Sequence, residues 1–146
     1  MSSIVQTQTT SFKAELYEGI HDLLTDTLKI ALYTAEANLN ADTVAYTTAN
    51  EITGTGYSAG GIVLTGTTIS TSGYVAYVNF NNALWSPASF TARCALIYNS
   101  SKNNPSTGTG RAIAVLDFGS DKTATTSFLI TMPPNTATAA LIRSSN

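Results

Sequence analysis

The feature that most constrains the fold of this chain is a period of two residues in the pattern of its apolar side chains. In residues 74–80 the alternation places four side chains on one face of an expected strand: Tyr74, Ala76, Val78 and Phe80. Side chains of a β-strand point alternately to its two faces, so this period is typical of strands. Turn residues separate such segments at regular spacing, and strands do not alternate with helices. The pattern therefore predicts an all-β protein.

We expect about eight strands, arranged as an antiparallel β-sandwich or jelly roll. The clearest segments are residues 28–34, 62–65, 74–80, 90–98, 112–118, 122–132 and 138–143. Leu28, Ile30 and Leu32 should share one face. A second set should also share a face, namely Phe90, Ala92, Cys94, Leu96 and Tyr98. Residues 112–118 form the most continuously apolar run of the chain, which predicts burial on both faces, and residues 99–110 read as a loop.

The N-terminal region differs from the rest of the chain. Residues 1–10 are polar and without periodicity, which predicts a flexible arm. Residues 11–18 predict a short helix that Ser11 caps and Gly19 ends, although a hairpin is a competing interpretation. Residues 11–146 then form a single β domain, as the length of the chain also suggests.

Charge is scarce in this sequence. Only 11% of its 146 residues are charged, against about 25% in an average protein. Ser and Thr replace the missing charge, and a neutral polar surface can be covered by another protein with little desolvation cost. The few Lys and Arg residues are scattered and the net charge is −2, which argues against nucleic acid as a partner. Neither a signal peptide nor an apolar run of about 18 residues is visible, so we expect no membrane association.

The glycine-rich segment 51–61 contains a possible catalytic motif. Gly56-Tyr57-Ser58-Ala59-Gly60 matches the nucleophile elbow of hydrolases, which would make the chain a small hydrolase that uses Ser58. An elbow needs a strand before it, a helix after it and a histidine later in the chain, but the single histidine, His21, precedes Ser58. The segment is also incompatible with a dinucleotide fingerprint, because Ala59 occupies the position of the third glycine. We interpret it as a turn.

Four further residues could have either a chemical role or a structural role. His21 and Asp22 could form a proton-transfer pair, but adjacent side chains usually point apart, so packing is the simpler role. Asp117 and Asp121 could chelate calcium, or they could cap a turn with hydrogen bonds.

Two other side chains could likewise have either a chemical role or a structural role. Trp85 could stack on a sugar, or it could serve as a packing or interface anchor. Cys94 lies in an apolar strand and reads as a small buried side chain rather than a reactive thiol. One cysteine and one histidine are too few for a zinc site. We therefore expect no catalytic, cofactor-binding or metal-binding residues, no cofactor and no enzymatic activity.

Five segments in order carry a resemblance to a known family. They are residues 12–19, 26–33, 50–61, 84–98 and 114–119, and Asn50-Glu51-Ile-Thr-Gly-Thr-Gly-Tyr-Ser-Ala-Gly-Gly61 is the strongest of them. Over residues 11–131 the chain resembles small structural proteins of tailed-phage virions, which are similar to capsid decoration (cement) proteins. The resemblance brings no catalytic residues.

The resemblance implies a role and a location. The chain would be made in the host cytoplasm and would lie on the outer surface of the capsid. There it would bind the major capsid protein and further copies of itself, as a dimer or trimer, and stabilise the head. A tail or head–tail connector component is an alternative, and so is a module that binds glycans or a host receptor.

Overall fold

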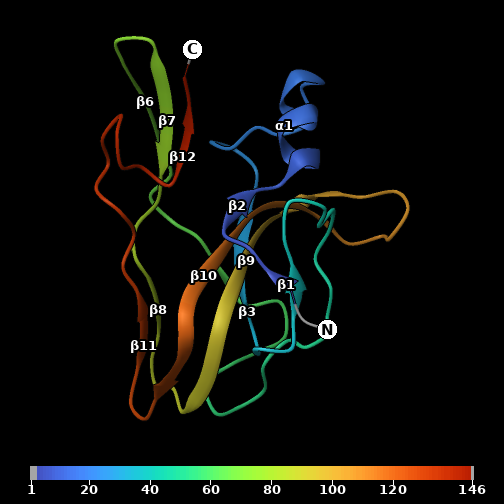
Figure 1. The fold of residues 1–146 in the computed structure, drawn as a ribbon, viewed down its shortest axis with the longest axis vertical. Helices are drawn as coiled ribbons and strands as arrows, with labels where there is room; N and C mark the ends of the chain where they lie inside the picture. The colour runs from blue at the N-terminus through green and yellow to red at the C-terminus, as the bar shows by residue number, and fades with distance from the viewer. Residues whose placement is uncertain (1–2, 146) are drawn as a thin grey trace.

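The computed structural model describes residues 3–145, which form a mostly β protein with one short helix (Figure 1). The helix is α1 (Thr10–Tyr17). The strands are β1 (Ser3–Ile4), β2 (Thr7–Gln8), β3 (Leu28–Tyr33), β4 (Asn38–Leu39), β5 (Ile62–Val63), β6 (Thr68–Ser72), β7 (Val75–Asn79), β8 (Ala83–Trp85), β9 (Phe90–Asn103), β10 (Gly110–Ala124), β11 (Phe128–Ile130) and β12 (Ile142–Ser144). The expectation of an all-β protein with a short N-terminal helix is confirmed.

The strands form four sheets. The largest is five-stranded and antiparallel, in the order β2-β10-β9-β3-β5. A three-stranded antiparallel sheet has the order β12-β7-β6, and in Figure 1 it lies at the same end of the molecule as α1. Two short ribbons complete the fold: β11 pairs antiparallel with β8, and β1 pairs parallel with β4.

The five-stranded sheet buries both of its faces. Leu28, Ile30 and Leu32 belong to one hydrophobic cluster, whereas Ala31 and Tyr33 on the opposite face of β3 belong to another. This division follows the predicted alternation of β3. The central part of β10 is also buried on both faces, as its apolar sequence predicts: Ala112, Ile113, Ala114, Val115 and Leu116 are all buried.

The predicted single face of the segment 90–98 is wrong. Phe90 and Ala92 join the first hydrophobic cluster, whereas Cys94, Leu96 and Tyr98 join the second. The pairing of β9 with β10 shifts register at this point, between the pairs of Asp117 and Lys122. An irregularity of this kind re-aims the side chains that follow it, and the alternation of the sequence alone does not reveal it.

Several boundaries also differ from the predicted ones. β9 and β10 extend into the predicted loop 99–110, and the predicted strand 122–132 is divided between the end of β10 and the separate strand β11. Strands β6 and β8 have no counterpart among the predicted strands. Both are short, and β6 is composed almost entirely of Thr and Ser, so it lacks apolar alternation.

The predicted flexible arm is held to the body of the protein over its described part. Residues 1 and 2 lie outside the described residues. β1 pairs with β4, and β2 pairs with β10. Thr9 is fully buried, and its hydroxyl accepts a hydrogen bond from the amide of Phe12 at 3.2 Å, so Thr9 rather than Ser11 caps α1. Backbone pairing and the cap therefore replace the freedom expected from a polar sequence.

The glycine-rich segment lies against the sheet so closely that two of its glycines have no room for a side chain. A Cβ on Gly61 would lie 1.8 Å from the carbonyl oxygen of Ile30, and one on Gly56 would lie 2.0 Å from that of Pro87. Both residues also have positive φ, of 78° and 88°. These glycines let the backbone pack directly on β3 and on the loop before β9, which gives the segment a structural role.

This contact yields a prediction with a matched control. Gly61 and Gly108 share a similar φ, 78° and 75°, but a Cβ on Gly108 would meet nothing within 4 Å. Gly108→Ala should cost on the order of 1 kcal/mol through the left-handed backbone alone. Gly61→Ala should cost at least about 2 kcal/mol more, because the carbonyl of Ile30 must move. Urea unfolding measures both, and equal losses would show that close packing does not constrain the segment.

Candidate functional site

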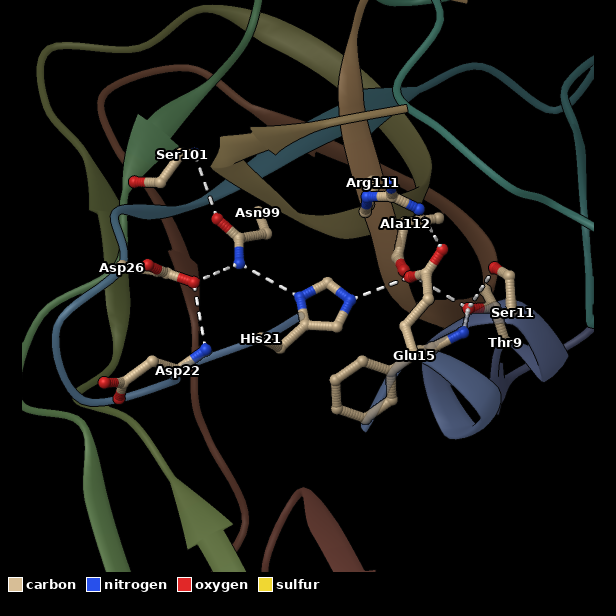
Figure 2. A network of polar contacts seen from close by, with 11 residues as sticks. Thr9, Ser11, Glu15, His21, Asp22, Asp26, Asn99, Ser101, Arg111 and Ala112 are labelled. Carbon is tan, nitrogen blue, oxygen red and sulfur yellow. Dashed lines mark hydrogen bonds and ion pairs between the residues drawn. The ribbon is translucent and has the colours of Figure 1, made fainter. Parts of the chain in front are cut away.

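Two polar clusters, whose members are buried or half-buried, hold most of the interacting ionisable side chains of the described residues. The first, which we call the His21 cluster, consists of Glu15, His21, Asp26, Asn99 and Arg111 (Figure 2). Its members come from α1, from the loop between α1 and β3, and from β9 and β10. The cluster therefore ties the helix and its following loop to the large sheet.

His21 lies at the centre of this cluster with a fully buried side chain. The side-chain amide of Asn99 donates to Nδ1 of His21 at 3.0 Å, which places the ring proton on Nε2. Nε2 then donates to the Glu15 carboxylate at 2.8 Å. The other oxygen of Glu15 accepts from Arg111 at 2.6 Å. Both ring nitrogens and both carboxylate oxygens are thus engaged within the protein.

Asp26 lies on the other side of Asn99. Its Oδ2 accepts hydrogen bonds from the Asn99 amide at 2.7 Å and from the backbone N–H of Asp22 at 3.0 Å, and Lys102 lies 3.6 Å from its Oδ1. Burial by itself raises the pKa of the Asp26 carboxyl, but these hydrogen bonds and the Lys102 charge outweigh it and lower the pKa below the ordinary 3.8.

The structure does not bring His21 and Asp22 together as a proton-transfer pair. The Asp22 carboxylate instead accepts from the backbone N–H groups of Leu24 and Thr25, so it caps a turn. The sequence analysis missed Asn99, which it placed in a loop. Asn99 is fully buried on β9, and its position directly after the apolar run of that strand is the one signal that could have indicated this.

The second cluster is organised by Glu51, and we call it the Glu51 cluster. The Glu51 carboxylate accepts hydrogen bonds from the hydroxyls of Tyr46 and Tyr57, at 2.7 and 2.6 Å, and from the backbone N–H of Gly60 at 2.7 Å. Tyr98 stacks on Tyr46 with ring centroids 4.7 Å apart and donates to the carbonyl of Gly60. One carboxylate at the start of the glycine-rich segment therefore holds the end of that segment.

The tyrosines of the Glu51 cluster are held in their neutral form. Burial, and then the hydrogen bond and charge of Glu51, raise the pKa of Tyr46 and Tyr57 above the ordinary 10.0. Burial and the charge of Glu51 also raise the pKa of Tyr98 to about 12. The hydroxyl of Tyr57 in addition accepts from the backbone N–H of Leu32 at 2.9 Å. Tyr46 and Tyr57 therefore donate hydrogen bonds to a carboxylate, and Tyr98 donates one to a backbone carbonyl.

Ser58 does not lie in a catalytic arrangement. It is exposed in the turn, and its carbonyl accepts from the N–H of Gly61 at 3.0 Å. The ring nitrogens of His21, which a serine nucleophile would need, are engaged by Glu15 and Asn99. The strand and helix that a nucleophile elbow requires on its two sides are absent from residues 51–61 of the described chain.

Trp85 is a packing residue. It is only 3% exposed and packs edge-on against Phe90 and Phe128, at centroid distances of 6.4 and 6.0 Å. Tyr57 also stacks near it, at 6.4 Å. A sugar could not reach this ring, so the hypothesis that Trp85 is a sugar-stacking platform is wrong. The aromatic cluster instead joins the glycine-rich segment to β8, β9 and β11.

Asp117 and Cys94 also take structural positions. The carboxylate of Asp117 accepts a hydrogen bond from the backbone N–H of Gly119 at 2.8 Å, so it caps a turn. The same carboxylate pairs with Arg93 at 3.4 Å. Asp121 is exposed. Cys94 is fully buried, and burial raises the pKa of its thiol to about 12. Among residues 3–145 no three His, Cys, Asp or Glu side chains are grouped so as to hold a metal ion.

No protein-family model, curated protein or solved structure matches this chain. None of the helices in residues 3–145 is long and apolar enough to cross a membrane. In both polar clusters most of the charged and hydrogen-bonding atoms bind to one another, and this arrangement can hold distant segments of the chain together.

The lowered pKa of Asp26 predicts a pH dependence of stability. The contribution of Asp26 should be fully present above pH 3.8 and should be lost as the pH falls through the lower pKa of the folded state. Asp26→Asn should therefore reduce the free energy of unfolding near neutral pH and flatten its decline in acid. Urea unfolding at a series of pH values measures both effects. Asp42→Asn, at an exposed position, controls for net charge; an unchanged acid slope in Asp26→Asn would contradict the account.

Proposed function

We propose that this chain is a structural protein of a tailed-phage particle and acts as a capsid decoration protein on the outer surface of the head. It binds across joints between major capsid subunits and stabilises the shell, because a protein that binds only the assembled state shifts the equilibrium toward that state. Many copies acting together make modest individual contacts sufficient. The resemblance in the five sequence segments suggested this role.

The observation that best supports the proposal is the distribution of charge. Residues 52–92 contain no Asp, Glu, Lys, Arg or His. This stretch includes β5 to β8, and several of its large apolar side chains are exposed: Val63 by 51%, Ile69 by 47%, Tyr74 by 89% and Leu84 by 52%. A surface of hydroxyl and apolar groups can be covered by another protein without stripping water from ions. Such a surface suits adhesion.

The internal polar clusters support the same role. A decoration protein has to keep its shape while it holds two neighbours, and the His21 and Glu51 clusters fix loops to the large sheet. The predicted sandwich or jelly-roll arrangement belongs to this proposal as well. Burial on both faces of the five-stranded sheet supports a layered arrangement of that kind.

The proposal predicts where the protein is found and how it binds. Particles that contain the chain are separated into heads and tails, and the chain is quantified in each fraction by mass spectrometry. We expect it on the heads at a copy number comparable to that of the major capsid protein. Because the chain has few charges, its retention should change little over a roughly tenfold range of salt concentration.

Heads from which the chain has been removed with mild denaturant provide the control. They should release DNA at a lower temperature than complete heads, and adding back the purified chain should restore the difference. Recovery of the chain with isolated tails, at a few copies per particle, would contradict the decoration role and favour the tail or connector alternative.

A further inference from the structure

The strand β6 forms an open edge of the three-stranded sheet. It pairs with β7 on one side, and β7 separates it from β12 on the other. Four of its five residues are exposed, including Ile69. In Figure 1 the hairpin of β6 and β7 projects at the end of the molecule, away from β8 and β11. An edge of this kind offers unpaired backbone groups to another strand.

The hairpin geometry defines which groups are free. Gly73 and Tyr74 form a two-residue turn, so Ser72 and Val75 are the first pair of the ladder. Hydrogen-bonded pairs then alternate with non-hydrogen-bonded pairs along the ladder. The backbone groups of Ser72, Ser70 and Thr68 therefore form the hydrogen bonds to β7. The N–H and C=O groups of Ile69 and Thr71 consequently point away from β7.

The other sheet edges in the described chain are shorter or better protected. No other edge strand exceeds three residues. β12 carries the charged residue Arg143, and the side chain of Gln8 donates to the carbonyl of Arg143 at 3.3 Å. In β5, Val63 pairs with the charged residue Lys29 of β3. Charged side chains and covering groups are the usual protection of an edge. β6, with the sequence Thr-Ile-Ser-Thr-Ser, has neither.

We propose that two copies of this chain pair through β6 in antiparallel orientation, with a two-fold axis at Ser70. In this register Ile69 of one copy faces Thr71 of the other. Their outward N–H and C=O groups then exchange hydrogen bonds, and the axis repeats the exchange on the other side of Ser70. The two three-stranded sheets become one continuous sheet of six strands.

The composition of the surface favours a second copy as the occupant. Identical surfaces that meet across a two-fold axis bring like charges together, but residues 52–92 contain none. The pairing also places Thr71 of one copy beside the exposed side chain of Ile69 of the other, a favourable cross-strand contact between β-branched residues. The β6 edge would then be the surface for the self-association expected of a decoration protein. Its test uses the purified chain alone, so it can fail independently of the virion proposal.

Disulfide trapping tests the axis directly. At a non-hydrogen-bonded antiparallel pair the two Cα atoms lie about 4.5 Å apart, which a disulfide can span. Ser70→Cys should therefore give a covalent dimer under mild oxidation with oxidised glutathione. Ser72→Cys, on the same face of β6 but away from the axis, should link at least 10-fold more slowly. Cys94 is fully buried and does not compete. Equal or faster linkage of Ser72→Cys would overturn the proposed register.

Sedimentation of charge variants tests the pairing itself. The wild-type chain should show a concentration-dependent dimer, and Ile69→Lys should raise its dissociation constant at least 10-fold. Leu84→Lys, at a similarly exposed position on β8, should leave it unchanged, and circular dichroism checks that both variants fold. A monomeric wild-type chain at all concentrations, or a dimer that Leu84→Lys weakens and Ile69→Lys does not, would overturn the proposal.

Discussion

The carboxylate of Glu51 is the constraint on which the glycine-rich segment depends. It binds two tyrosine hydroxyls and the amide of Gly60, and one of those hydroxyls also satisfies the amide of Leu32 in the large sheet. A carboxylate that is partly withdrawn from water requires such donors, because leaving it without them would be costly. These hydrogen bonds hold the end of the segment 51–61 against its start and fix the segment to β3. The packing of Tyr57 near Trp85 extends this order to β8.

The His21 cluster has the corresponding role for α1, and the two clusters are neighbours on β9, where Tyr98 belongs to one and Asn99 to the other. It joins α1 and its following loop to β9 and β10 through hydrogen bonds that occupy both nitrogens of the imidazole. The two clusters thus take up several ionisable groups of the protein, and residues 52–92 carry no charge. Fixed loops and an uncharged stretch of chain fit the adhesive role proposed above.

The sequence predicted the features that depend on local pattern and missed those that depend on pairing. Alternation identified β3 and β7, and continuous apolarity identified the buried part of β10. The division of β9 between two cores was missed because a register shift has no local signature. The polar segment before α1 predicts a flexible arm, because the backbone pairing of β1 and β2 leaves little trace in side-chain composition. Asn99 and Glu51 could not be assigned their partners, because those partners come from distant parts of the chain.

Hydrogen exchange at single amides measures how firmly the Glu51 carboxylate holds the glycine-rich segment. The amides of Gly60 and Leu32 are held by side chains of the Glu51 cluster, not by regular secondary structure. The account predicts that both exchange slowly in the wild-type protein and that Glu51→Gln speeds exchange at Gly60 while the amides of β9 and β10 stay protected. Fast exchange of Gly60 in the wild-type protein, or no change in Glu51→Gln, would contradict it.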